Sequence, residues 1–350
     1  MKTLSIDTIR ELIRLSGPCI TIFLPSYRPG GQTLRHPSTL LRTFIQQAER
    51  ELPGLNLDLK QINDLLKPLH AMVADTATDH GSHWPRAILL SPGTFETFYL
   101  REAVVPRCVT GTSFYLPPLL SELSLPDVFY ALKISLKQAA LFRAQFSLEP
   151  LAIPGKVSGE LAGFLELNEP DHALEIRSTV GHFAGPRVRF STATDRETFQ
   201  SHLADYYRAI DHALRELSPK PVILVGVAED TSLYRQVTSD PNLADGTIEE
   251  HAPDQEILER GYAILRAEAA ERAAQLMAEK ERMGPSRFTV DQQIVVERAE
   301  QGRIESLFLR VGADDETSNL AAVETIRHGG KIFALPAATM NTPAAAELRY

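Results

Sequence analysis

Short apolar runs rich in β-branched residues alternate with long amphipathic stretches along this chain, and this alternation limits the folds open to it. "CITIFLP", residues 19–25, and "PVILVGVA", residues 221–228, are short and bounded by proline, as buried strands often are. "DRETFQSHLADYYRAIDHALREL", residues 195–217, repeats apolar positions at helical spacing behind Asp195, a suitable N-cap. Strands that alternate with helices in this way predict an α/β fold with mixed sheets.

The composition is that of a globular protein. Of its 350 residues 43% are apolar and 23% are charged, which are ordinary values, and this length predicts two or three domains. No apolar run reaches the roughly 18 residues of a membrane span, and the N-terminus shows no signal peptide, so we expect a cytoplasmic protein. The net charge of -9 argues against coating nucleic acid through bulk electrostatics, and any RNA contact requires a local basic patch.

Motifs for phosphate, metal and nucleophile chemistry are missing or incomplete. Neither GxxxxGK[ST] nor GxGxxG occurs, and no GxSxG selects a nucleophile. His80 and His83 beside Asp79 have a ligand-like spacing, but no further ligand matches them, so a surface turn is favoured and neither a metal nor a cofactor is expected. Cys19 and Cys108 lack zinc-ligand partners and are interpreted as small buried apolar residues.

Two acidic residues follow a predicted strand. Glu229 and Asp230 come after "PVILVGV", at the C-terminal edge of a sheet, where ligands often bind. A solvated loop is the favoured interpretation of both.

Two stretches are locally basic despite the negative total. Residues 27–42 and 176–192 contain no acid, and their guanidinium groups suit phosphate. Phe183 and Phe190 add stacking surfaces to the second stretch. The candidate RNA-contacting residues are Arg177, His182, Gly185, Arg187 and Arg189, and a second candidate loop holds Arg28, Gly30, Gly31, Gln32 and Arg35. Solvated loops are the alternative for both.

Strands and helices are expected in three successive groups. The first third is expected to contain strands at residues 86–91, 94–100 and 113–120. Residues 128–135 and 138–146 read as a hairpin, followed by a loop-rich stretch over residues 148–194. The last third reads as a long helix, interrupted only by Gly261, and then helix, strand, helix and strand.

Five segments occur in an order that matches a known superfamily. They are "SFYLPPLLSELSLPDVFYALKISLKQAALFRAQ", "RFSTATDRETFQSHLADYYRAIDHALREL" with "KPVILVGVAEDTSLYRQV" soon after it, "VERAEQGRIESLFLR" and "AAVETIRHGGKIFALPAATMNTPAAAELRY". In this order the chain resembles the archaeo-eukaryotic class 1 release factor and Pelota superfamily, specifically its bacterial branch. The resemblance implies a three-domain architecture: an N-terminal α/β domain (1–125), a middle RNase H-like domain (126–253) and a C-terminal ribosomal-protein-like α/β sandwich (254–350).

The resemblance also locates the family's catalytic loop. That Gly-Gly-Gln loop lies in the middle domain before the long helix, where this chain has "TVGHFAGPRVRF" and no such triplet. Gly30-Gly31-Gln32 instead follows the first predicted strand, and Pro29-Gly30-Gly31 is interpreted as a turn. The family's Asn-Ile-Lys-Ser codon-reading motif is also absent. Gln32 is therefore predicted to be dispensable, and codon-dependent peptide release is not expected.

What the resemblance implies is a ribosome-associated translation factor that acts in ribosome rescue, quality control or hibernation. Its expected partners are the ribosome and tRNA or rRNA, with a translational GTPase as a further candidate. Two alternatives stay open: an enzyme, either a peptidyl-tRNA hydrolase that uses His182 or an RNA-cleaving relative, and a protein-binding adaptor that has lost ribosome contact. Of these readings, the non-enzymatic translation factor is preferred.

Overall fold

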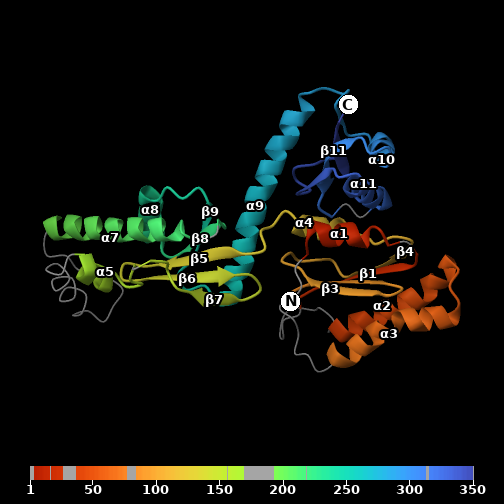
Figure 1. Ribbon diagram of the computed structural model, residues 1–350, viewed down its shortest axis with the longest axis horizontal. Coiled ribbons are helices and arrows are strands. Elements are labelled where there is room, and N and C mark those ends of the chain that lie inside the picture. The colour runs from red at the N-terminus through yellow and green to blue at the C-terminus, as the bar shows by residue number, and fades with distance from the viewer. Residues whose placement is uncertain are drawn as a thin grey trace. The chain divides into compact units, whose positions relative to one another are not determined.

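A computed structural model of the protein describes residues 4–15, 17–26, 37–76, 84–155, 157–168, 193–217, 219–312 and 315–349 (Figure 1). The chain divides into two compact units. The first combines Met1–Leu125 with Arg266–Tyr350, and the second comprises Pro126–Leu265. The first unit therefore joins the two ends of the sequence.

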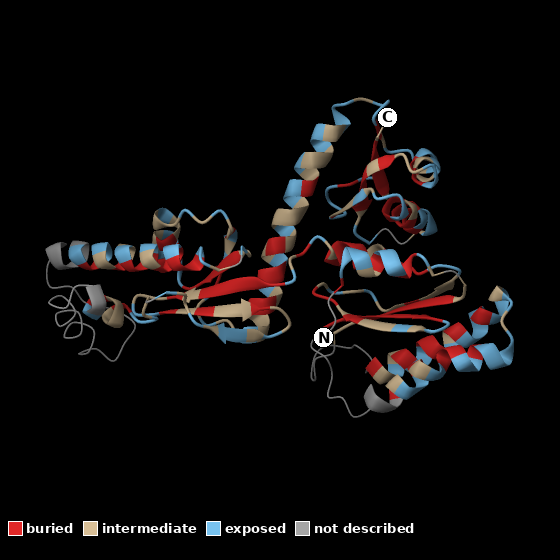
Figure 2. Cartoon of the chain, in the orientation of Figure 1, coloured by how far each residue is buried: buried red, intermediate tan, exposed pale blue. Residues whose placement is uncertain are grey.

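The N-terminal part of the first unit contains an antiparallel sheet of four strands. They are β1 (Cys19–Leu24), β2 (Arg86–Ser91), β3 (Thr94–Tyr99) and β4 (Arg107–Gly111), in the order β3-β2-β1-β4. Every residue of β1 and β2 is buried, because both strands are central and covered on both faces (Figure 2). The strands predicted at residues 19–25, 86–91 and 94–100 are confirmed.

Helices cover both faces of this sheet. On one face lie α2 (Pro37–Glu51) and α3 (Leu59–Thr76), joined by the 3-10 helix η1 (Leu52–Leu55). Leu41 and Leu66 of these helices share a core cluster with Ile22 and Ile88 of the sheet. The short helix α1 (Ile6–Leu12) packs its buried residues with the residues of the other face, including Phe23.

The segment 113–120, expected to be a strand, forms a turn and a helix instead. Pro117–Glu122 is helix α4, with prolines in its first positions, where a missing N–H costs nothing. The same prolines cannot donate to a strand ladder, which is why the expectation was wrong. The fourth strand of the sheet is β4, which was not predicted.

The C-terminal part of the first unit contains a second sheet, in the order β10-β13-β11-β12. Its strands are β10 (Phe288–Thr289), β11 (Ile304–Arg310), β12 (Lys331–Leu335) and β13 (Ala344–Leu348), and its helices are α10 (Gln292–Glu300) and α11 (Glu316–Arg327). The side chains of Asp291 and Asp315 cap the two helices. The predicted order of helix, strand, helix and strand is confirmed, and β13 is an additional strand.

The two sheets of the first unit share one hydrophobic core. Leu89 of the first sheet and Leu307 of the second belong to the same buried cluster. Asn319 of α11 adds polar contacts: its amide nitrogen donates to the carbonyl of Phe114 at 3.1 Å, and its Oδ1 accepts from the N–H of Leu116 at 2.9 Å. One side chain thus satisfies two backbone groups in the segment that leads into α4.

A buried ion pair lies close to α4. Arg101 Nε donates to Glu122 Oε2 at 2.9 Å, and Glu122 Oε1 accepts the backbone N–H groups of Arg101 and Glu102. Burial raises the pKa of Glu122, and the Arg101 guanidinium opposes that shift. Arg266, in helix α9 (Asp254–Glu281), donates to the carbonyl of Arg101 at 3.1 Å.

The second unit contains a mixed sheet of five strands in the order β7-β6-β5-β8-β9. They are β5 (Phe129–Ile134), β6 (Ala139–Ala144), β7 (Leu148–Leu151), β8 (Val222–Val225) and β9 (Leu243–Ile248). β5 and β6 form the predicted antiparallel hairpin, while β5, β8 and β9 are parallel. The predicted mixed-sheet α/β class is confirmed.

Aromatic side chains fill the core of the second unit. Its helices include α5 (Leu161–Asn168), α7 (Ala193–Leu214) and α8 (Ala228–Val237). Tyr206 and Tyr207 of α7 and Tyr234 of α8 are almost fully buried, and the rings of Tyr207 and Tyr234 lie 5.5 Å apart between centroids. The helix predicted at residues 195–217 is confirmed. The stretch expected to be loop-rich contains β7 and α5.

Helix α9 packs tightly against β5 in the second unit. A Cβ atom added to Gly261 would lie 2.3 Å from the ring of Phe129. The neighbouring Tyr262 meets the same ring edge-on, with centroids 5.1 Å apart, and donates its hydroxyl to the carbonyl of Asp127. The single glycine inside this long helix is therefore explained by close packing.

In the described part of the chain, no helix combines the length and the apolar character needed to cross a membrane. The predicted division at residues 125 and 253 into three domains stays a prediction.

Candidate functional site

Both segments predicted to contact RNA lie outside the described residues. The first, within residues 169–192, holds Arg177, His182, Gly185, Arg187 and Arg189, and the second, within residues 27–36, holds Arg28, Gly30, Gly31, Gln32 and Arg35. Their roles stay predictions. The structure shows the elements at which each segment begins and ends.

Residues 169–192 connect α5 to α7 in the second unit. Leu165 of α5 and Leu203 of α7 belong to one core cluster, and the rings of Phe164 and Tyr206 lie 5.4 Å apart between centroids. The two helices that flank this segment therefore pack on each other in one core.

Residues 27–36 lie between β1 and α2 in the first unit. β1 is paired on both sides, and α2 begins at the buried Pro37, whose fixed φ suits the first helical position. The segment therefore follows a strand and precedes a helix, and the turn predicted at Pro29-Gly30-Gly31 stays a prediction.

The acidic pair Glu229 and Asp230 lies in the first turn of α8, after β8. Glu229 is exposed, as expected, but Asp230 is only 4% exposed, so the expectation of a solvated loop was wrong for it. Burial is the largest of the causes that raise the pKa of Asp230 to about 6, and the negative charges of Glu250 and Glu229 add to it. The backbone hydrogen bond from Leu136 opposes the shift. A pKa near 6 allows this carboxyl group to exchange a proton close to neutral pH.

No cluster of three or more His, Cys, Asp and Glu side chains within the described residues could hold a metal ion. Asp79, His80 and His83 lie in residues 77–83, which the structure does not describe. The expected lack of a metal there stays a prediction.

Cys19 and Cys108 are both buried and unpaired with each other, as interpreted from the sequence. Burial raises the pKa of Cys19 to about 11, and burial together with the charge of Glu51 raises the pKa of Cys108 to about 12. Thiols with such pKa values are poor nucleophiles, so neither is suited to catalysis.

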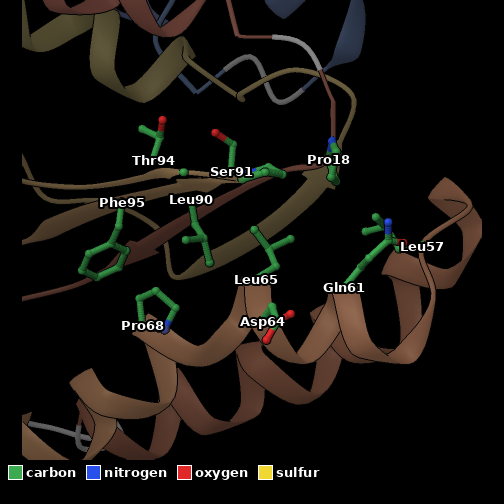
Figure 3. Close-up of a pocket in the computed structure, with 12 residues that line it drawn as sticks. Pro18, Leu57, Gln61, Asp64, Leu65, Pro68, Leu90, Ser91, Thr94 and Phe95 are labelled. Carbon is green, nitrogen blue, oxygen red and sulfur yellow. The ribbon is translucent and has the colours of Figure 1, made fainter.

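A cavity of about 550 Å³ opens in the first unit between α3 and the turn that joins β2 to β3 (Figure 3). This volume is typical of ligand pockets. Figure 3 shows Leu65 and Pro68 pointing from α3 towards Leu90 and Phe95 on the strands. The apolar lining consists of Pro18, Leu57, Leu65, Pro68, Leu90, Pro92 and Phe95. Sequence analysis did not predict this cavity, because its walls come from separate segments.

Polar groups line the same cavity on its α3 side. Asp58 and Gln61 form a reciprocal cap: Gln61 N–H donates to Asp58 Oδ1 at 2.7 Å, and Asp58 N–H donates to Gln61 Oε1 at 2.9 Å. This leaves the Gln61 amide nitrogen as a donor. The Asp64 carboxylate, also in the lining, has no hydrogen bond or ion pair within the described residues.

A sequence profile of bacterial archaeo-eukaryotic release factor family 3 matches residues 128–303, half of the chain. The chain belongs to this family. The match begins in the second unit and continues through α9 and α10. The resemblance inferred from the order of the sequence segments is confirmed.

Solved structures similar to this family member include Pelota and release-factor proteins. Pelota of Archaeoglobus fulgidus is 11% identical, with 100% of this chain and 94% of that chain covered and a TM-score of 0.40. Dom34 of S. cerevisiae, a translation termination-like factor, is 12% identical over 79% and 81% of the two chains, with a TM-score of 0.35. The archaeal termination factor aRF1 is 14% identical over 99% of both chains, with a TM-score of 0.26. No curated protein sequence matches the chain.

Proposed function

We propose that this protein is a ribosome-associated translation factor that acts in ribosome rescue, quality control or hibernation, without codon-specific peptide release. The observation that carries the proposal is the family match over residues 128–303. The proposed partners are the ribosome and its tRNA or rRNA, and a translational GTPase is a further proposed partner.

The proposed RNA-contacting loop is the segment that connects α5 to α7. Arg177, Arg187 and Arg189 give it three guanidinium groups, which bind phosphate in a planar, bidentate manner. The packing of α5 on α7 supports the proposal, because the two helices that flank the segment belong to one core.

Binding without codon-specific release is supported by the sequence of this loop. Positioning a water at a peptidyl ester requires preorganised groups aimed at the reacting carbon. Residues 169–192 contain neither Gly-Gly-Gln nor any other glutamine, and Asn-Ile-Lys-Ser occurs nowhere in the chain. Gln32, in the other segment, is proposed to be dispensable.

Co-sedimentation with ribosomes over a series of salt concentrations tests the proposal. The test variant carries Arg177→Ala, Arg187→Ala and Arg189→Ala. A matched control removes three cations from the exposed faces of α2 and α3 through Arg50→Ala, Lys60→Ala and Lys67→Ala. We expect the test variant to bind more weakly and to flatten the dependence of log affinity on log salt by up to about 2, because each lost contact with single-stranded phosphate contributes about 0.7.

Two results would contradict the proposal. Failure of the wild-type protein to pellet with ribosomes at low salt would support the adaptor alternative instead. Release of peptide from stalled complexes by the wild type, abolished by His182→Ala, would support the hydrolase alternative.

A further inference from the structure

We infer that the cavity between α3 and the β2–β3 turn is a docking site for a short protein segment that places a large apolar residue beside a lysine or arginine. Family membership assigns nothing to this cavity. The inference is independent of ribosome binding, because the cavity lies in the first unit, outside residues 128–303.

The walls of the cavity favour an apolar anchor. Leu65 and Pro68 of α3 face Leu90 and Phe95 of the sheet, so an aliphatic or aromatic side chain between them is contacted from both sides (Figure 3). Leu65 and Leu90 are buried, which makes the floor of the cavity part of the packed core. Burial of an apolar side chain there removes apolar surface of both partners from water.

The polar groups favour a cation next to the anchor. Asp64 is the one charged residue in the lining, and its carboxylate has no partner among the residues that the structure describes. The lining therefore offers a cation the two oxygens of the Asp64 carboxylate. An ammonium or guanidinium group has the several donors that such acceptors require.

The exposure of Phe95 favours a protein segment over a small molecule. The residue is 42% exposed although it lines the cavity, so an occupant must also extend over the outer side of the ring to cover it. A peptide with an apolar anchor and flanking residues does this, as aromatic contacts at the centres of protein interfaces do. The net charge of -9 of the whole chain is likewise complementary to a basic segment.

The test uses the full-length protein with labelled leucine methyl groups and three synthetic tetrapeptides, followed by NMR. The first peptide is Lys-Trp-Leu-Lys, the second replaces both lysines by glutamates, and the third replaces Trp-Leu by Ser-Ser. We expect the first peptide alone to shift the methyl signals of Leu57, Leu65 and Leu90 in a saturable manner. The methyl signals of Leu320, an exposed leucine of α11, should not move.

Three variants identify the groups responsible. Phe95→Ser should weaken binding of the first peptide about fivefold, because it removes an aromatic anchor contact. Asp64→Asn should weaken it about threefold, which is typical of a partly exposed ion pair. Lys67→Gln removes a charge of opposite sign from an exposed position on the same helix and should not weaken binding. All three positions are exposed, and thermal unfolding checks that the variants remain folded.

Three results would overturn the inference. Equal affinity for the lysine and glutamate peptides would contradict the role of Asp64. Unchanged affinity of a folded Phe95→Ser variant would contradict the assigned cavity. Binding of tryptamine as tight as that of the first peptide would show that the cavity takes a small aromatic amine rather than a protein segment.

Discussion

In the first unit, buried polar side chains add long-range hydrogen bonds to the hydrophobic core that its two sheets share, whereas in the second unit tyrosine rings cluster in the core between the helices and the sheet. In the first unit, Asn319 and Leu116 are 203 positions apart in sequence and meet through a hydrogen bond. In the second unit, Tyr207 and Tyr234 meet within one continuous stretch of chain. Directional hydrogen bonds specify how distant segments meet, while aromatic rings bury large apolar areas in close-packed arrangements.

Each unit offers a further example of its kind of contact, although the buried Asp211 of the second unit also accepts hydrogen bonds, from Thr238 and Arg215. Glu347 of β13 is buried and accepts from Ser306 at 2.8 Å and from Lys280 at 3.0 Å. In the second unit, the Phe129 ring packs against both Gly261 and Tyr262. We therefore expect the first unit to lose the most stability when one partner of a buried polar contact is removed. In the second unit, we expect a change in side-chain volume to test the packing most directly.

Breaking the Arg101–Glu122 pair should have the largest effect. Glu122→Gln keeps the shape but removes the negative charge that is paired with the buried Arg101 guanidinium, which costs about 3–5 kcal/mol of unfolding free energy. Urea unfolding measures the loss, and hydrogen exchange over residues 86–125 locates it. Glu49→Gln, at a largely exposed position on α2, is the control.

A double variant tells loss of the charge pair from loss of packing. Arg101→Met with Glu122→Met removes both charges and should recover most of the stability that Glu122→Gln loses. A double variant less stable than Glu122→Gln would show that the hydrogen bonds to the backbone N–H groups of Arg101 and Glu102 matter more than the charges.

Removing the Asn319 contacts between α11 and the segment that leads into α4 should have the next largest effect. Asn319→Ala leaves the Phe114 carbonyl and the Leu116 N–H buried without their partner, at a cost of about 1–3 kcal/mol. Asn63→Ala, on the exposed face of α3, is the matched control. If hydrogen exchange rose equally in both variants, Asn319 would have no special role in joining these segments.

Filling the space at Gly261 tests the packing of the second unit. In an exposed helix, Gly→Ala stabilises by up to about 1 kcal/mol. Here the added methyl group meets the Phe129 ring at 2.3 Å, so we expect a net loss of about 1–2 kcal/mol, measured by thermal unfolding. Adding Phe129→Leu should recover part of the loss. A stabilised Gly261→Ala variant would contradict the close contact between α9 and β5.

The contrast between the units also explains what could be predicted from the sequence. β1 and β2 were predictable because their apolar, largely β-branched or leucine-rich runs fit buried strands whatever surrounds them. β13 was not, because "AAAEL" has the composition of a helix, and only its place between β10 and β11 makes it a strand. Long-range polar contacts such as that of Asn319 produce no local pattern in the sequence, so they could not be predicted from it.

The candidate sites divide in the same way. The basic character of residues 176–192 is visible in the sequence, since it depends on composition alone. The cavity beside α3 is not visible, because Pro18, Leu65 and Phe95 come together only after folding. The burial of Asp230 was missed for the same reason. In the first turn of α8, Glu229 is exposed to solvent while the next residue, Asp230, is buried, and only the folded structure distinguishes the two.

Neutralising Asp230 should have the smallest effect and a distinctive pH dependence. Its pKa is raised from an ordinary value of 3.8 to about 6, so the folded protein binds its proton more tightly than the unfolded chain does. The resulting stability is fully present below about pH 4 and is lost as the pH rises to about 6. Asp230→Asn removes this decline and should stabilise the second unit at pH 7 by on the order of 1 kcal/mol.

Urea unfolding from pH 4 to 7 measures the difference, with Asp254→Asn, at an exposed position of α9, as the control. A constant difference between Asp230→Asn and the wild type over this range would show that burial, and not titration, sets the contribution of Asp230.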